Sequence, residues 1–260
     1  MYRSILPACL VLLCASAACS VKEDRGPCPC YLKVTFADPD ASGPVQLAGW
    51  DTETVFREKV RIEDCRPAWT RPVRKGTFVL SACKGAGNAV PDGREVRIPV
   101  NCEADSLYAF SREVDATGDV ATVEVTLRKQ FATVFLDLRK TPETMQGFRF
   151  QVDGNTCGFN LLDFSPVRGP FRCEPRPAEG GSVVTFRVPR QTDDSLEITV
   201  RPADAPPARF PLGEYISRSG YSWKTEELQD IYIVIDLARG RLDLRVEDWE
   251  EGIEFPLIEI

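Results

Sequence analysis

The chain has 260 residues, with 32 basic and 39 acidic side chains and a formal net charge of −7. This acidic balance argues against binding to nucleic acid, because phosphate contacts need clustered Lys and Arg. The chain contains no histidine, which excludes Ser-His-Asp and Cys-His catalysis and histidine metal sites. Frequent Pro and Gly, many short apolar runs and no long helical period predict an all-β protein.

The first residues predict a lipoprotein signal peptide. Arg3 precedes a short apolar run that Pro7 interrupts, and three small residues then stand before Cys19. The run is well below the roughly 20 apolar residues that a membrane-spanning helix needs. Small residues leave an extended backbone accessible to a peptidase, so we expect residues 1–18 to be removed and Cys19 to carry lipid. An ordinary signal peptide, with Cys19 incidental, is the alternative.

Residues 19–30 form the predicted tether between the lipid and the fold. Each buried CH2 of an acyl chain contributes about 0.8 kcal/mol, and stable anchoring needs more than one chain. A diacylated or triacylated Cys19 would meet that condition. The charged residues Lys22, Glu23 and Asp24 cannot enter a bilayer and suit a solvated segment.

Seven cysteines follow Cys19, and an oxidising compartment would allow up to three disulfides among them. The easiest pair to propose is Cys157 with Cys173, whose short loop would add about 3 kcal/mol when closed. A thiolate metal site at Cys28, Pro29 and Cys30 is the functional alternative, but it lacks a second ligand cluster. We therefore expect disulfides or buried thiols, and neither a metal nor a cofactor.

Alternating polar and apolar residues predict a first β-sandwich domain over residues 31–128. Two loops interrupt it, at residues 65–72, where two prolines lack the donor of a central strand, and at residues 85–93. The expected strands cover residues 31–36, 45–49, 52–62, 75–83, 95–100, 106–112 and 120–128.

A second series of strands predicts another β-sandwich domain over residues 129–260. The stretch 231–235 is apolar on both faces, which is typical of a central strand. A short helical turn is expected only at residues 214–216 and 225–228, with Thr225 as a candidate N-cap. The expected strands cover residues 131–138, 148–152, 158–163, 182–188, 196–202, 231–236 and 242–246, followed by a terminal run to residue 257.

Several segments, in order along most of the chain, resemble the fimbrillin-related anchor subunits of type V pili, which are minor-fimbrium anchor lipoproteins of Bacteroidales-type bacteria. The residues that carry the resemblance are Cys19 with residues 22–24, then 28–32, 105–108, 125–132, 210–216, 220–223, 228–232 and 246–249. The chain departs from the family pattern at Ser16, where a leucine is common, and in its number of cysteines.

The resemblance implies two tandem transthyretin-like β-sandwich domains and an outer-membrane lipoprotein that roots a fimbrium. Residues 22–24 would then resemble a surface-export signal. The partners implied are fimbrial structural subunits, joined by addition of a strand to an incomplete sheet. Our candidate for the contact strand holds Ile253, Phe255 and Leu257, although these residues equally fit the last strand of their own domain.

Two other functions compete with an anchor. A surface carbohydrate-binding lipoprotein would stack sugars on exposed tryptophans, and burial of all of them would argue against it; the candidates are Trp50, Trp69, Trp223 and Trp249. An enzyme is not expected, because adjacent acids such as Asp193 and Asp194 are usually solvated and no nucleophile has an activating base.

Overall fold

The computed structural model describes residues 28–139, 147–177, 183–203, 206–236 and 241–246. Nearly all of its regular structure is strand, which confirms the all-β prediction. The helical elements in these residues are the 3-10 turn η1 (Ile62–Cys65) and the helix α2 (Leu212–Arg218). None of the helices described is long and apolar enough to span a bilayer.

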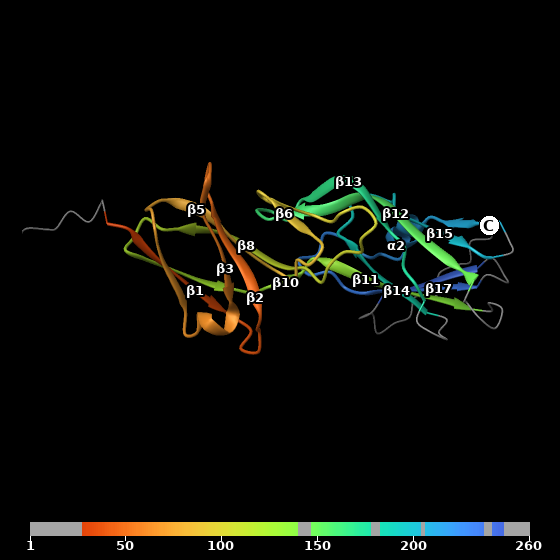
Figure 1. Cartoon of the computed structure of the whole chain (residues 1–260), viewed down its shortest axis with the longest axis horizontal. Helices are drawn as coiled ribbons and strands as arrows, with labels where there is room; N and C mark the ends of the chain where they lie inside the picture. Colours follow the sequence, from red (N-terminus) through yellow and green to blue (C-terminus); the bar gives the residue numbers. More distant parts are fainter. Residues whose placement is uncertain (1–27, 140–146, 178–182, 204–205, 237–240, 247–260) are drawn as a thin grey trace, which may run out of the picture.

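Two sheets face each other at the N-terminal end of an elongated molecule (Figure 1). In the first, the β1 sheet, β1 (Cys30–Phe36) lies between the antiparallel β4 (Trp69–Val73) and the parallel β9 (Val120–Val125). The second, the β2 sheet, has the order β10 (Arg128–Lys129), β8 (Tyr108–Asp115), β5 (Thr77–Lys84), β2 (Pro44–Trp50) and β3 (Thr54–Arg61). The side chains of Leu32, Leu47 and Leu80 fill the core between the sheets.

Two further sheets form the other end of the molecule. The β11 sheet has the order β14 (Val183–Pro189), β11 (Phe131–Arg139), β17 (Ile231–Asp236) and β18 (Arg241–Val246). The β12 sheet has the order β16 (Ala208–Phe210), β15 (Glu197–Arg201), β12 (Arg149–Asn160), β7 (Glu95–Arg97) and β6 (Val90–Asp92), and β13 (Pro166–Cys173) also pairs with β12. β11 repeats the arrangement of β1, because it too has one antiparallel and one parallel neighbour.

The β2 sheet contributes to both hydrophobic cores. Val45 and Leu47 of β2 belong to the N-terminal core, whereas Ala48 and Trp50 belong to the C-terminal one. Trp50 donates its indole N–H to Ser81 Oγ at 2.7 Å, which satisfies the polar atom of a buried ring. The apolar end of β2 therefore reflects burial on both faces of the strand.

The β6–β7 hairpin links the two ends of the molecule. β7 pairs with β12, with Gly158 opposite Arg97, so a segment from the first predicted domain completes a sheet of the second. Ladder hydrogen bonds thus cross the predicted boundary between residues 128 and 129. The division into domains at 31–128 and 129–260, and their transthyretin-like topology, stay predictions.

Most of the expected strands are present. The segment 231–236 is a strand with a neighbour on each side, and Ile231 and Ile233 are buried, which confirms its central position. The expected loop at residues 65–72 is wrong in its second half, because β4 begins at Trp69. β4 pairs only with β1, and an edge strand tolerates Pro72.

Three features differ from the sequence-based prediction. The expected strands 148–152 and 158–163 both overlap one long strand, β12, which ends at Asn160 and whose irregular register near Thr156 interrupts the alternation. β13 and β16 were not predicted, and β6 lies within the loop expected at residues 85–93, because it pairs with β7 in a hairpin. Residues 214–216 do lie in α2, but residues 225–228 are not helical. Thr225 is therefore no N-cap, and its hydroxyl instead donates to the carbonyl of Glu227 at 2.8 Å.

Candidate functional site

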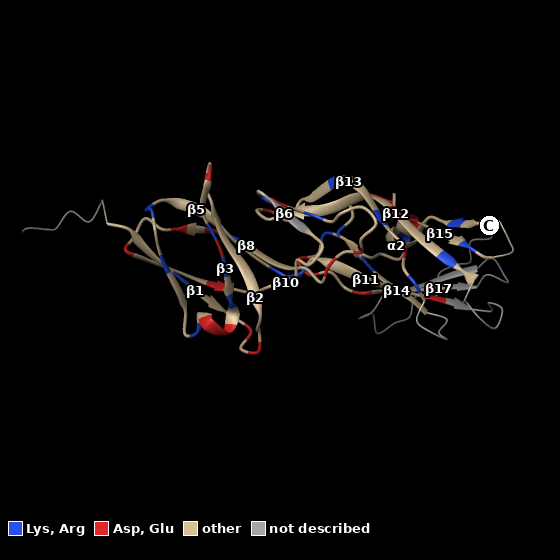
Figure 2. Cartoon of the chain, in the orientation of Figure 1, with Lys and Arg blue, Asp and Glu red and all other residues tan. Residues whose placement is uncertain are grey.

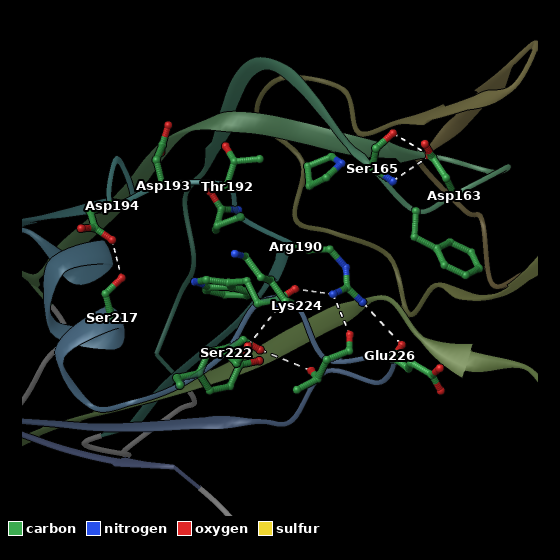
Figure 3. Close-up of a pocket in the computed structure, with 16 residues that line it drawn as sticks. Asp163, Ser165, Arg190, Thr192, Asp193, Asp194, Ser217, Ser222, Lys224 and Glu226 are labelled. Atoms are coloured by element: carbon green, nitrogen blue, oxygen red, sulfur yellow. Dashed lines mark hydrogen bonds between the residues drawn. The ribbon is translucent and has the colours of Figure 1, made fainter.

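A cleft of about 760 Å³ opens in the C-terminal half of the molecule. Four separate segments line it: residues 163–166 between β12 and β13, residues 190–194 after β14, Ser217 near the end of α2, and residues 221–226. Figure 3 shows the segment 163–165 on one side, the loop of Ser222, Lys224 and Glu226 on the other, and Arg190 between them. Tertiary packing alone brings these segments together.

Arg190 holds the 221–226 loop in place. Its side chain is 7% exposed and donates to the carbonyl oxygens of Trp223 and Thr225, the latter at 2.7 Å, and to Gln130 Oε1 at 3.0 Å. Burial lowers the pKa of the guanidinium from its ordinary value, although an arginine keeps its charge in proteins. Arg190 therefore acts as a cationic clamp that satisfies several loop carbonyls at once.

Two buried polar atoms beside the cleft lack a partner among the described residues. They are the Nε–H donor of Arg190 and the Oε1 acceptor of Gln191, a side chain that is 3% exposed. A buried donor or acceptor without a partner costs about 1–3 kcal/mol. Such groups usually bind ordered water or a ligand.

Carboxylates on opposite sides of the cleft are oriented by neutral donors. Asp193 accepts from Asn155 Nδ2 at 2.8 Å and from the backbone N–H of Ser195 at 3.0 Å. Hydrogen bonds from the Asn155 side chain and from Ser195 hold the pKa of Asp193 below its usual value. Asp194 accepts from the Ser217 hydroxyl, as Figure 3 shows. The hydrogen bonds thus hold both carboxylates in fixed directions.

Asp163 is fixed on the opposite side in the same way. Its Oδ1 accepts from the Ser165 hydroxyl at 2.6 Å and from the Ser165 N–H at 2.9 Å. The neighbouring Phe164 has a positive φ of 59°, which is uncommon for a bulky residue. The backbone of this turn thus places an aromatic ring and a carboxylate side by side at the cleft.

Two aromatic rings form one wall of the cleft. The rings of Tyr221 and Trp223 meet edge to face, with centroids 4.8 Å apart. The Tyr221 hydroxyl donates to the carbonyl of Gln229 at 2.9 Å, and burial raises the pKa of this phenol. The pair is therefore rigid and presents apolar ring surface next to the polar groups.

The 221–230 loop is also tied to the start of β11. Lys129 Nζ lies 2.5 Å from Asp230 Oδ1, and the same carboxylate oxygen accepts from the backbone N–H of Thr133 at 2.8 Å. Burial alone would raise the pKa of Asp230, but the hydrogen bonds from Lys129 and Thr133 outweigh it and hold the pKa below its usual value. This contact joins one side of the cleft to the junction between the two sets of sheets.

The predicted disulfide between Cys157 and Cys173 is wrong. Both thiols are free and buried. Cys173 lies opposite Val152 in the β12–β13 ladder, whereas Gly158 lies opposite Val167. Cys157 and Cys173 are therefore about 15 Å apart along the strands, and a disulfide needs Cα atoms within roughly 7 Å.

Two cysteines of the tether end lie in different environments. Cys28 is exposed, whereas Cys30 is fully buried in β1. Among the residues that the structure describes, no group of three or more acidic or thiol side chains is placed to hold a metal ion.

Basic and acidic residues are interspersed along both ends of the molecule (Figure 2).

The three tryptophans that the structure describes do not share one exposed face for a sugar. Trp50 is buried, and half-buried Trp69 packs against Phe56 with ring centroids 5.7 Å apart. Trp223 lines the cleft, and Trp249 lies outside the described residues. The remaining predicted site residues also lie outside them: Cys19, Lys22, Glu23, Asp24, Ile253, Phe255 and Leu257.

No family model matches the chain, and no curated protein matches it by sequence. Solved structures do match its fold. A candidate polysaccharide-binding protein from Bacteroides thetaiotaomicron has a TM-score of 0.63 at 14% identity, over 86% of this chain and 100% of that one. A candidate adhesin from Bacteroides ovatus has a TM-score of 0.59 at 14% identity, over 87% and 95%.

A third match is the fimbrial anchor protein Mfa2 from Porphyromonas gingivalis. Its TM-score is 0.60 at 10% identity, over 85% of this chain and 98% of that one. At such low identities the likeness establishes the fold. The chain is thus an all-β protein with the fold of bacterial fimbrial and candidate adhesin proteins.

Proposed function

We propose that this chain is a non-catalytic subunit of a fimbrium, held in the outer membrane by lipid on Cys19 and acting as its anchor or as a minor subunit. The observation that carries the proposal is the likeness to the fimbrial anchor protein over most of both chains. The small residues before Cys19 and the charged Lys22, Glu23 and Asp24 after it support lipid attachment and export to the surface. An anchor of this kind needs no cofactor.

Subunits would join by addition of a β-strand at a sheet edge. In the described part of the chain, β18 pairs only with β17, so β18 forms an edge of the β11 sheet. The segment with Ile253, Phe255 and Leu257 follows β18 within a few residues. A strand added to an edge gains main-chain hydrogen bonds, while alternate side chains give specificity. This segment is our candidate for the subunit contact.

The chain would fold as two tandem transthyretin-like sandwich domains, residues 31–128 and 129–260, behind the tether of residues 19–30. The matching neighbours of β1 and β11 support a repeated unit. The shared β2 sheet and the β6–β7 hairpin would couple the two units. Residues 31–128 and residues 129–260 can be expressed as separate proteins. Thermal unfolding of each protein should show whether it folds stably without the other.

Membrane attachment is tested by Cys19→Ala and by deletion of residues 19–30. Both changes should release the protein, and fimbriae with it, from the outer-membrane fraction. Cys28→Ala is the matched control, because Cys28 is an exposed cysteine of the same region and should leave attachment unchanged. Membrane association that survives Cys19→Ala would refute the lipid anchor.

Subunit contact is tested by Phe255→Asp and its neighbour Glu254→Ala. The first change places a charge on the apolar face of the candidate strand, whereas the second alters the alternate face. Fimbrial subunits should no longer co-purify with the Phe255→Asp protein, and they should co-purify with the Glu254→Ala protein. Equal recovery of subunits with both proteins would exclude this strand as the contact.

A further inference from the structure

We propose that the cleft between residues 163–166, 190–194 and 221–226 binds a neutral oligosaccharide. Its volume of about 760 Å³ lies within the roughly 300–1,000 Å³ of small-molecule sites. Figure 3 shows polar side chains on opposite sides of it, Asp163 and Ser165 on one and Asp193, Asp194 and Ser217 on the other, with Arg190 between them. The site is therefore large enough for two or three sugar rings and is polar on more than one side.

The groups in the cleft match the two kinds of surface that a sugar presents. Hydroxyl groups donate to carboxylates, and Asp163, Asp193 and Asp194 are held in fixed directions by their neutral donors. The C–H face of a sugar ring is apolar and packs on aromatic surface, which Tyr221 and Trp223 supply. Such a combination of rings and oriented carboxylates suits a polyol better than an apolar ligand.

The buried Arg190 Nε–H and Gln191 Oε1 have no partner among the described residues, and both atoms are closed off from the solvent of the cleft. Both side chains are more than nine-tenths buried and line the cleft. One atom is a donor and the other an acceptor, so an internal water, and not the ligand, would serve them.

The charges around the cleft select a neutral ligand. Four carboxylates line it, from Asp163, Asp193, Asp194 and Glu226, against the two cations of Arg190 and Lys224, and Arg128 beyond the lining pairs with Glu226, so three acids face two cations. The negative excess repels a uronic acid or a phosphate. A cationic ligand would instead meet the buried guanidinium of Arg190 in the middle of the cleft. An uncharged polyol avoids both conflicts.

This inference does not depend on attachment to a fimbrium. A sugar site would give a surface subunit an adhesive function, but it could equally operate in a monomeric lipoprotein. Loss of membrane attachment in the Cys19 variant and loss of sugar binding in a cleft variant are therefore separate results.

Calorimetric titration of the detergent-solubilised full chain tests the proposal. The probes are maltotriose, cellotriose and mannotriose, with trigalacturonate as the acidic and trilysine as the cationic counterpart. At least one neutral trisaccharide should bind saturably at concentrations up to about 10 mM. Binding should be accompanied by a change in tryptophan fluorescence, because Trp223 lines the cleft.

Two variants assign the binding to the cleft. Trp223→Ala removes the ring but keeps the carbonyl that Arg190 binds, and Thr192→Tyr fills the cleft from an exposed position. Each should weaken binding at least about tenfold. Trp69→Ala is the matched control, because Trp69 is half-buried and packs on Phe56 in the other core. It should change affinity less than about twofold.

Circular dichroism and thermal unfolding establish that each variant is folded before titration. No saturable binding of any neutral trisaccharide overturns the proposal. Tighter binding of trigalacturonate or trilysine than of the neutral sugars overturns the charge argument and with it the ligand class. Binding that survives both Trp223→Ala and Thr192→Tyr places the sugar elsewhere and overturns the site.

Discussion

Replacing Arg190 with alanine removes the clamp that joins Gln130 to the loop beside the cleft. The side chain makes close hydrogen bonds to Trp223 O, to Thr225 O at 2.7 Å and to Gln130 Oε1 at 3.0 Å. Hydrogen bonds to a charged group contribute about 1.5–3 kcal/mol each. The freed loop carbonyls border an open cleft, so they regain water and recover part of this free energy.

We therefore expect Arg190→Ala to lower the free energy of opening of the 221–226 loop by about 3–4 kcal/mol. Arg190→Lys should cost about 1–2 kcal/mol, since a lysine keeps the charge but cannot bond to both Gln130 and the loop. Native-state hydrogen exchange measures this directly. The amides of the loop should exchange several hundredfold faster in the alanine variant, since each 1.4 kcal/mol is about tenfold.

Arg209→Ala is the control for this prediction. Arg209 lies on β16, where its side chain is 72% exposed and 3.7 Å from Glu197. A surface ion pair of this kind contributes less than about 1 kcal/mol. If Arg190→Ala accelerates loop exchange no more than Arg209→Ala does, the loop is held by other contacts and the clamp interpretation is wrong.

Three further predictions follow from particular contacts. Asp230→Ala should destabilise the protein by about 1–2 kcal/mol at pH 7. Because the folded-state pKa of Asp230 is lowered, the difference in stability between the two proteins should be largest above about pH 5. It should shrink as the pH falls below about 4. Gly158→Ala should cost about 2–3 kcal/mol and expose the β6–β7 amides, since a Cβ there would lie 1.9 Å from the backbone oxygen of Val96. Iodoacetamide at mildly alkaline pH should modify exposed Cys28 and spare Cys83, whose pKa burial raises to about 12.

Each of these predictions has its own control. Urea unfolding across the pH range measures the Asp230→Ala difference, and a difference that grows on acidification would contradict the assigned pKa shift. Gly118→Ala should be nearly neutral, because the nearest atom to its Cβ is 3.8 Å away; a similar cost at Gly118 and Gly158 would refute the close-approach argument. Denaturant should make Cys83 as reactive as Cys28, and equal rates in the folded protein would contradict its burial.

Strands that follow a single local pattern could be predicted from the sequence. Leu32 and Val34 alternate with polar neighbours, and the structure places both in a core as part of β1. The apolar run of β17 likewise indicates a strand with neighbours on both sides. In these cases local periodicity and tertiary burial agree, because each residue faces one environment.

Prediction failed where the environment depends on distant segments. Pro72 looks like a loop residue until the pairing of β4 with β1 places it on an edge strand. Gly154 and Asn155 interrupt the alternation of β12, yet the strand continues through them in an irregular ladder. Arg190 resembles an ordinary surface cation, because its partners Trp223 and Thr225 lie more than 30 residues further along the chain.

The sequence by itself determines the all-β class, the exclusion of histidine chemistry and the expectation of lipid at Cys19. These conclusions depend on composition and on short contiguous patterns, which need no knowledge of long-range contacts. Only the tertiary structure decides that one sheet serves two cores, that Cys157 and Cys173 stay apart, and that four segments meet around Arg190. Strand order and register set these distances, and neither can be deduced from periodicity within a single segment.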